Sequence, residues 1–278
     1  MSGRARENSR NEHLDSVRRF DDRAGNYERF RPDYPPQVVE LLRRDAGLPA
    51  AGHVADIGSG TGKLSDVFLR AGYRVTGVEP NDAMRAAAER QFGGEGRFTS
   101  VAGTAEATLL PDRSVDAIVA GQAFHWFEPR AARVEFQRIL RAGAGGDRGP
   151  DAAGGPVALI WNDRRTSDCP LHADYEALLL RHCPGYAAVQ RGAPDEAALA
   201  SFFSPAPMTE LCCPNSQVVD WNGLLGRVLS ASYVPLAGPE HEALVAGLRA
   251  SFERHADDGR VALLYDTRMF AGRLGTRL

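Results

Sequence analysis

Lysine is nearly absent from this chain of 278 residues: Lys63 is its only lysine, and arginine carries the rest of the positive charge. The formal net charge is −3, and no cluster of basic residues stands out. A protein that binds the phosphates of nucleic acid or an anionic membrane concentrates lysine and arginine on one face. The sequence therefore predicts neither a nucleic-acid partner nor a membrane partner.

Cysteine and long apolar runs are also scarce. The chain has four cysteines and no C-x-x-C pair or His/Cys cluster, so we expect no metal site. No run of about 18 apolar residues is present that could span a membrane. The first 30 residues are polar and lack the apolar core of a signal peptide. A reduced, cytoplasmic protein is the simplest interpretation.

The most informative stretch is a glycine-rich turn at 54–63, Val-Ala-Asp-Ile-Gly-Ser-Gly-Thr-Gly-Lys. The apolar residues before its first glycine predict a short buried strand, and apolar residues recur at helical spacing from Leu64. A strand, a glycine turn and a helix start bring backbone N–H groups close to a ligand. The G-x-G-x-G spacing is neither the G-x-G-x-x-G of dinucleotide folds nor a Walker phosphate loop. Asp56 suits a ligand with a cationic or donor group near the turn.

Around this turn the pattern alternates between strands and helices. We expect strands at 54–58, 73–79, 98–102, 115–120 and 157–161, with helices at 62–71, 82–91 and 129–141. Such alternation predicts a parallel sheet with right-handed crossovers and a ligand beyond the carboxyl ends of the strands. Further along, we expect helices near 171–182, 195–202, 224–229 and 240–255 and a strand over 208–219. Residues 261–264 and 269–274 predict a late strand or strand pair.

Three motifs follow the first strand in order: the glycine turn, Val-Thr-Gly-Val-Glu-Pro-Asn-Asp-Ala-Met at 75–84, and Gly-Thr-Ala-Glu-Ala at 103–107 with Leu-Pro-Asp-Arg-Ser-Val-Asp at 110–116. With this order and spacing, residues 54–162 resemble the class I S-adenosylmethionine-dependent methyltransferases. Four further stretches are similar to the small-molecule enzymes of the trans-aconitate methyltransferase-like group. They are 27–35, Gln-Ala-Phe-His-Trp-Phe at 122–127, Ser-Ala-Ser-Tyr-Val-Pro at 230–235, and Leu-Leu-Tyr-Asp-Thr-Arg-Met-Phe at 263–270.

The resemblance implies an α/β fold: a Rossmann-like, seven-stranded, mostly parallel sheet with helices on both faces. An N-terminal helical lid and a helical insertion after the fifth strand would be added to it. The expected segments are a lid at 1–50, a cofactor-binding core at 51–165, an insertion that caps the substrate at 166–207, and strands and helices at 208–278 that complete core and cap.

The cofactor implied is S-adenosyl-L-methionine, with S-adenosyl-L-homocysteine as product. Glu79, at a strand end about 20 residues after the glycine turn, would accept both ribose hydroxyls. Asp56 and the glycines would border the methionine part, residues 104–106 would flank the adenine, and Arg31 would bind the cofactor carboxylate. The whole expected cofactor set is Tyr27, Arg31, Asp56, Gly58, Ser59, Gly60, Gly62, Glu79, Pro80, Met84, Thr104, Ala105, Glu106, Gly121 and Gln122.

His125 is the main candidate for proton abstraction, because it follows the fourth strand and an imidazole titrates near neutral pH. The alternative is a histidine that only packs or positions the substrate, since methyl transfer by in-line displacement can need positioning alone. Tyr27 and Tyr233 complete the candidate catalytic group. The expected substrate-binding residues are Tyr34, Phe124, His125, Trp126, Trp161, Asn162 and Tyr233.

The acceptor is a small molecule in every version that we favour. An aromatic pocket suits C- or N-methylation of an indole or another aromatic natural product of secondary metabolism. The alternative is a carboxylate O-methyltransferase, which needs a cationic clamp from Arg164, Arg165 or Arg31. A non-catalytic protein that binds S-adenosylmethionine and an NAD-dependent oxidoreductase are further rivals. A nucleic-acid methyltransferase is disfavoured by the pI of 6.2 and by Gln122-Ala-Phe-His, which replaces the Asn/Asp-Pro-Pro-aromatic turn. The sequence gives no indication of oligomeric state.

Overall fold

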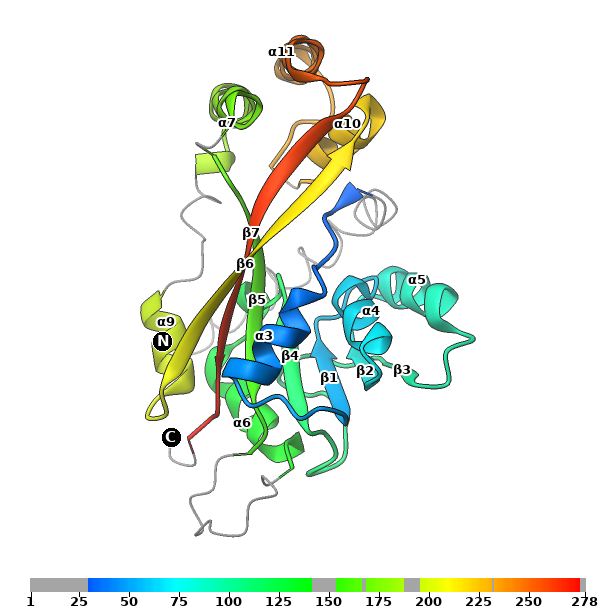
Figure 1. Cartoon of the computed structure of the whole chain (residues 1–278), viewed down its shortest axis with the longest axis vertical. Coiled ribbons are helices and arrows are strands. Elements are labelled where there is room, and N and C mark those ends of the chain that lie inside the picture. Colours follow the sequence, from blue (N-terminus) through cyan, green and yellow to red (C-terminus); the bar gives the residue numbers. More distant parts are fainter. Residues whose placement is uncertain (1–29, 142–153, 167–168, 188–195, 232, 276–278) are drawn as a thin grey trace, which may run out of the picture. The chain divides into compact units, whose positions relative to one another are not determined.

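A computed structural model describes residues 30–141, 154–166, 169–187, 196–231 and 233–275 (Figure 1). The chain divides into two compact units, and each is described by itself. The described residues of the core unit are 34–141, 154–162, 196–213 and 267–275. Those of the helical unit are 30–33, 163–166, 169–187, 214–231 and 233–266.

Seven strands form one sheet in the order β3-β2-β1-β4-β5-β7-β6 (Figure 1). The four pairings among β1 to β5 are parallel, and β7 runs opposite to β5 and β6. The strands are β1 His53–Ile57, β2 Arg74–Val78, β3 Phe98–Val101, β4 Ala117–Gly121, β5 Val157–Arg164, β6 Met208–Val219 and β7 Val261–Gly272. The order reverses between β1 and β4, so their carboxyl ends form the switch point where such sheets bind ligands. The expected α/β, Rossmann-like, mostly parallel seven-stranded sheet is confirmed.

The sequence is compatible with either one late strand or a strand pair at 261–264 and 269–274. The structure has a single strand there, β7, and buried and less buried side chains alternate through residues 265–268 without a break.

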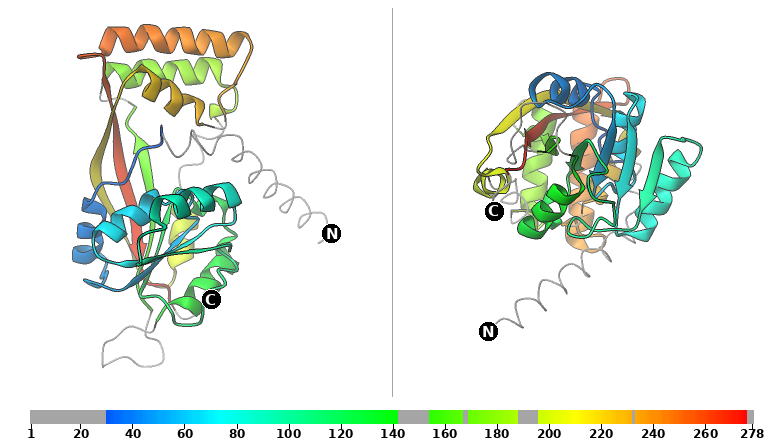
Figure 2. Two further views of the ribbon diagram at one scale, coloured as in Figure 1. Left: turned by 90° about the vertical axis from the view of Figure 1, so that its right-hand side faces the viewer. Right: turned by 90° about the horizontal axis from the view of Figure 1, so that it is seen from below.

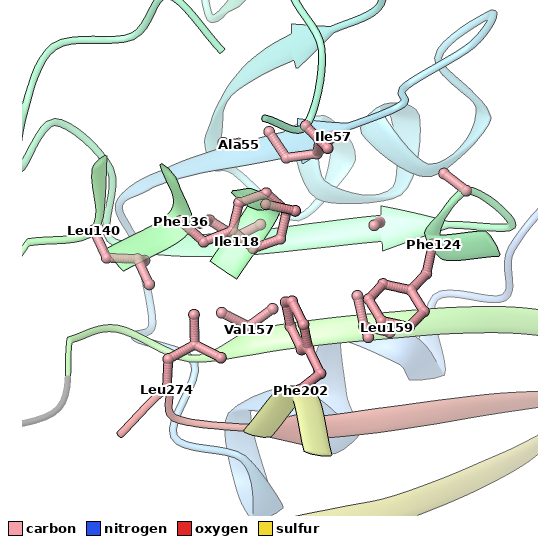
Figure 3. Packing of buried hydrophobic residues seen from close by; sticks show 14 of the residues in the cluster. Ala55, Ile57, Ile118, Phe124, Phe136, Leu140, Val157, Leu159, Phe202 and Leu274 are labelled. Carbon is pink, nitrogen blue, oxygen red and sulfur yellow. The ribbon is translucent and has the colours of Figure 1, made fainter. Parts of the chain in front are cut away.

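Helices cover both faces of the sheet in the core unit (Figure 2). Alternate residues of each central strand point to opposite faces, and both sets are apolar, as expected for buried parallel strands. Ala55 and Ile57 pack with Phe136 and Phe202 on one face (Figure 3), whereas Val54 packs with the other helices. The helices are α6 Pro129–Ile139 and α9 Glu196–Phe203 on the first face, and α3 Gln37–Asp45, α4 Lys63–Arg70 and α5 Asp82–Phe92 on the second.

The helical unit has an apolar core of its own. Its helices are α7 Pro170–His182, α10 Trp221–Leu229 and α11 Pro239–His255. Helices α7 and α11 lie side by side (Figures 1 and 2), and Leu179, Leu244 and Leu248 belong to the buried cluster. Within the described residues, no helix combines the length and apolar character needed to cross a bilayer.

The four segments expected from the sequence stay a prediction, and the two compact units divide the chain at other residues. Residues 34–50 and 196–207 lie in the core unit, because the apolar sides of α3 and α9 pack on the sheet. Helix α7 lies in the helical unit instead. The roles of lid and cap stay predictions.

Candidate active site

The glycine turn after β1 adopts a backbone conformation that favours glycine at each of its three G-x-G-x-G positions. Gly58, Gly60 and Gly62 have φ of +69°, +56° and +88°, a region that favours glycine. A Cβ on Gly58 would also lie 2.7 Å from the Cβ of Ala123. Beside Gly60 the nearest atom to such a Cβ is the sulfur of Met84, at 3.7 Å. Ser59 joins the turn to β2, since its backbone N–H donates to the carbonyl of Val78 at 3.2 Å.

Asp56 is buried in β1 directly before this turn, with an exposed fraction of 1%. Its Oδ2 accepts a hydrogen bond from Ser65 Oγ at 2.7 Å, but its Oδ1 has no hydrogen-bond partner. Burial raises the pKa of Asp56 to about 7, the Ser65 hydrogen bond opposes this, and the charge of Glu79 adds to it. A buried carboxylate oxygen without a donor is costly, so it fits a ligand that supplies a donor or a positive charge.

Glu79 follows β2 and lies on the other side of the same turn, with an exposed fraction of 7%. Its Oε2 accepts from Gly60 N and its Oε1 from Asn81 N, both at 2.9 Å. Burial raises the pKa of Glu79, and these two donors oppose the shift. A carboxylate can accept about four hydrogen bonds, so both oxygens keep capacity for ligand hydroxyls. Glu79 therefore has the position and chemistry expected of a ribose ligand.

Asn81 caps α5, and the cap fixes Met84 beside the glycine turn. Asn81 Oδ1 accepts from Met84 N at 2.9 Å. Pro80 contributes its carbonyl, which accepts from Arg85 Nη1 at 3.1 Å. The Met84 side chain is buried and has its sulfur next to Gly60.

The carboxyl end of β4 brings Gly121, Gln122, Tyr34 and Asn162 together. Gln122 has φ of +57°, which is strained for a residue with a side chain. Its N–H donates to Ile160 O at 2.8 Å, and its Nε2 donates to Asn162 O at 3.3 Å. A Cβ on Gly121 would lie 2.5 Å from Tyr34 Oη, so the tyrosine closes directly on the glycine. Strain of this kind concentrates at functional sites.

The segment after β3 is fixed by hydrogen bonds to α6. Thr104 and Ala107 form a bridge, Ala105 is buried, and Glu106 Oε1 accepts from Glu128 N at 2.8 Å. These contacts hold the three residues expected to flank the adenine beside the end of β3.

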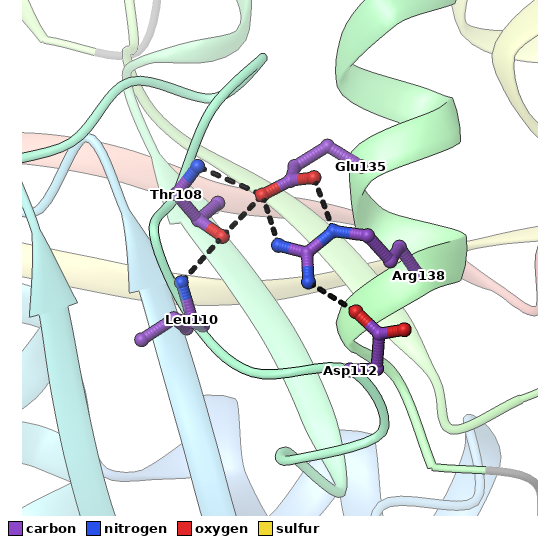
Figure 4. A network of polar contacts seen from close by, with 5 residues as sticks. All are labelled: Thr108, Leu110, Asp112, Glu135 and Arg138. Atoms are coloured by element: carbon purple, nitrogen blue, oxygen red, sulfur yellow. Dashed lines mark hydrogen bonds and ion pairs between the residues drawn. The ribbon is translucent and has the colours of Figure 1, made fainter.

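A second network holds the next part of the same loop (Figure 4). Glu135 Oε1 accepts from Thr108 N at 2.8 Å and from Thr108 Oγ1 at 2.5 Å, and both Glu135 oxygens accept from Arg138. The Arg138 and Thr108 donors lower the pKa of Glu135 to about 2. Glu135 thus stays ionised and anchors the loop.

The aromatic turn after β4 splits between core and surface. It forms a short 3₁₀ helix, η1 Phe124–Trp126. Phe124 and Trp161 are buried in the apolar cluster of Figure 3 and contact each other edge to face, so packing is their observed role. His125 is exposed, and its ring lies 4.7 Å from that of Trp126, which is 44% exposed. Contact of any of these residues with an acceptor stays a prediction.

The other residues expected at the site are not among the described residues of the core unit. Tyr27 lies outside the described residues. Arg31 and Tyr233 belong to the helical unit, so their approach to the cofactor or acceptor stays a prediction. Of the expected cationic clamp, Arg164 Nη2 bonds Glu176 Oε2, and Arg165 Nη2 bonds Asp266 Oδ1 at 2.7 Å.

Sequence reasoning missed Arg227, a buried arginine of α10. Its signal was available, because it interrupts the apolar run Leu-Leu-Gly-Arg-Val-Leu at 224–229 in an expected helix. In the part of the chain that the structure describes, no group of three or more His, Cys, Asp or Glu could hold a metal ion.

Comparison with known proteins places the core unit's site inside a recognised domain. Residues 55–144 match the protein-family model described as a methyltransferase domain. An uncharacterized methyltransferase of Mycobacterium tuberculosis is 38% identical over 150 residues, which are 52% of each chain. One from Schizosaccharomyces pombe is 32% identical over 151 residues, which are 54% of this chain and 55% of the relative. The chain thus spans about half the length of the curated relatives it matches.

Solved structures support the fold over a longer part of the chain. A proposed type II methyltransferase from Anaeromyxobacter dehalogenans aligns with a TM-score of 0.61 and 24% identity, covering 88% of this chain and 98% of that one. A proposed methyltransferase from an antibiotic biosynthesis pathway of Anabaena variabilis aligns with a TM-score of 0.58 and 21% identity, covering 87% and 98%. At these identities the likeness concerns the fold. The glycine turn, Asp56, Glu79 and the turn after β4 all fall within the matched methyltransferase domain.

Proposed function

We propose that this protein is an S-adenosylmethionine-dependent methyltransferase that acts on a small molecule. The observation that carries the proposal is the pair of buried carboxylates, Asp56 and Glu79, on either side of the glycine turn within the matched domain. S-adenosylmethionine brings an ammonium group, a sulfonium with the transferable methyl, and two ribose hydroxyls. Asp56 Oδ1 offers an acceptor to a cationic donor, and Glu79 offers its oxygens to the hydroxyls.

The chain's own residues would bind and orient the cofactor and the acceptor. The turn at 58–62 allows close approach of the cofactor to the backbone, and the sulfur side of Met84 offers an apolar contact. Gln122 and Tyr34 lie at the carboxyl end of β4, where the reacting groups would meet. Positioning of this kind supplies much of the catalysis of a displacement reaction.

For the acceptor, we propose an aromatic small molecule of secondary metabolism that is methylated on carbon or nitrogen, with His125 as general base. Support comes from the exposed imidazole after β4 and from the exposed Trp126 ring beside it. The sequence also resembles the trans-aconitate methyltransferase-like group, and carboxylate O-methylation of a small organic acid is the alternative.

Thermal shift with S-adenosylhomocysteine and with NAD tests the cofactor. We expect a rise in Tm with S-adenosylhomocysteine alone, because binding to the native state stabilises it. Stabilisation by NAD alone would refute the proposal. Transfer from methyl-labelled S-adenosylmethionine to a panel of aromatic and acidic metabolites then tests activity, and binding without transfer to any acceptor would favour a non-catalytic protein.

The His125→Ala variant tests the base. If His125 removes a proton, kcat should fall by about 10²- to 10⁴-fold while affinity for S-adenosylhomocysteine stays unchanged. His182→Ala is a control, because His182 bonds Glu240 on the helical unit. Full activity of His125→Ala would leave the histidine a packing role.

A further inference from the structure

Arg227 is a buried charge in the helical unit whose hydrogen bonds are incomplete. It lies in α10 with an exposed fraction of 8%. Its Nε donates to Tyr265 Oη at 3.3 Å, whereas its buried Nη1 has no hydrogen-bond partner. A guanidinium does not lose its proton in proteins, so this nitrogen remains a charged donor.

The groups around Arg227 do not balance its charge. The groups that interact with it electrostatically include the side chains of Tyr265, Tyr175 and Tyr233. Phenols are neutral near pH 7, and burial raises the pKa of Tyr175 to about 12. Neutral hydroxyls orient a guanidinium but supply no negative charge. A buried charge without a counter-charge is unfavourable, and among the described residues Arg227 has no bonded carboxylate.

Two other arginines of the helical unit form ion pairs with carboxylates. Arg164 bonds Glu176 and stacks on the Tyr175 ring, with its guanidinium carbon 4.3 Å from the ring centroid. Arg254 pairs with Asp174 at 2.7 Å. Arg227 differs from both because no carboxylate of the described residues bonds it.

We propose that Arg227 binds an oxyanion, a carboxylate or phosphate group of a small-molecule ligand. The planar fork of a guanidinium matches both groups. Tyr265 would act as a positioning residue through its bond to Nε. Tyr233 is partly exposed and its ring lies 4.9 Å from that of Tyr186, so it offers an aromatic surface to the body of the ligand. This anion binding does not depend on the proposed function.

The test is thermal denaturation of the full chain with benzoate and with phenyl phosphate, each beside a neutral counterpart, benzamide and phenol. Ionic strength is held constant because salt screens charge. We expect at least one anion to raise Tm where its neutral counterpart does not. A response to benzoate alone identifies a carboxylate site, and a response to phenyl phosphate alone identifies a phosphate site.

Variants assign the response to this residue. Arg227→Met should abolish the anion-dependent shift, and Arg227→Lys should weaken anion affinity about tenfold, because it keeps the charge but loses the fork. The exposed Arg254→Met is the matched control and should respond as the wild type does. Isothermal titration of Arg227→Lys decides the question if Arg227→Met does not fold.

Three results would overturn the proposal. The first is a wild type whose Tm does not rise with either anion. The others are an anion-dependent rise in Tm that survives in Arg227→Met and an anion affinity that is undiminished in Arg227→Lys. Affinity for S-adenosylhomocysteine, measured in the same samples, distinguishes failure of the Arg227 anion site from failure of the methyltransferase proposal. Unchanged affinity with a lost anion response supports the site. A wild type that binds anions through Arg227 but not S-adenosylhomocysteine would contradict the methyltransferase proposal and leave the anion site standing.

Discussion

The core unit and the helical unit each bury a charged side chain with an atom that has no hydrogen-bond partner among the described residues. Asp56 of the core unit has an Oδ1 without a donor, and Arg227 of the helical unit has an Nη1 without an acceptor, so the two groups have opposite signs. Asp56 can escape its unfavourable burial by taking up a proton, and its pKa of about 7 reflects this. Arg227 cannot neutralise itself. The comparison teaches that one candidate site responds to pH, whereas the other demands an anion at any ordinary pH.

Removing each buried charge should stabilise the protein without ligands, and this is the largest effect that we expect. Burial raises the pKa of Asp56 from 3.8 to about 7, so its ionisation destabilises the folded state as pH rises through this range. At 1.36 kcal/mol per pKa unit, Asp56→Asn should raise the free energy of unfolding by about 4 kcal/mol at pH 8 and by about 2 kcal/mol at pH 5. Urea unfolding at the two pH values measures both. A gain that does not change with pH would show that Asp56 is ionised throughout.

Arg227→Met should also stabilise, but equally at pH 5 and pH 8, because the guanidinium keeps its proton. An uncompensated buried charge carries a desolvation penalty on the order of several kcal/mol, and an apolar side chain of similar volume removes it. The same urea experiment measures the change. A loss of stability would mean that other groups of the free protein compensate the charge of Arg227. The comparison of Arg227 with Asp56 as two uncompensated buried charges would then be wrong.

Glu79→Ala should lower the affinity for S-adenosylhomocysteine by about 30- to 150-fold, or about 2–3 kcal/mol, because hydrogen bonds to a charged acceptor are lost. Calorimetric titration measures the change. Glu89→Ala, on the exposed side of α5, is the control and should bind as the wild type does. Equal affinities of the two variants would place the ribose elsewhere.

Glu135 contrasts with Asp56, because both of its carboxylate oxygens accept hydrogen bonds, from Thr108 and Arg138. Donors lower its pKa from 4.5 to about 2, so its stabilising contribution is present above pH 4.5 and is lost as pH falls through 2. Glu135→Gln should therefore destabilise at pH 7, by about 2 kcal/mol, where Asp56→Asn stabilises. Thermal unfolding of the two variants side by side gives the sign of each effect.

The smallest expected effect is the pH dependence of cofactor binding. If the cofactor binds the ionised form of Asp56, a pKa of about 7 predicts about tenfold weaker binding of S-adenosylhomocysteine at pH 6 than at pH 8. Titrations at the two pH values measure this. The slope should disappear in Asp56→Asn, and a slope that persists would have to come from another group.

Much of the core unit was predictable because its signals are local. Apolar strands, the glycine spacing and the Asn81 cap are read within a few residues, and a mostly parallel sheet follows from the alternation of strands and helices. The helical unit was less predictable, since its pairings join segments far apart in sequence. Its arginines illustrate this: Arg164 and Arg165 were candidates for the cationic clamp of the alternative carboxylate O-methyltransferase, and each bonds a carboxylate of the protein itself.

The sequence by itself determined the glycine turn, the acidic residues beside it and the α/β alternation, because each depends on residue type and short-range spacing. Only the tertiary structure decided which charges are balanced. Whether Asp56 keeps an oxygen without a donor, whether Gln122 adopts a left-handed conformation, and whether Arg227 lacks a carboxylate all depend on neighbours brought together by folding. Burial and partnership are three-dimensional quantities, and they are what makes a charged side chain a candidate for binding a ligand.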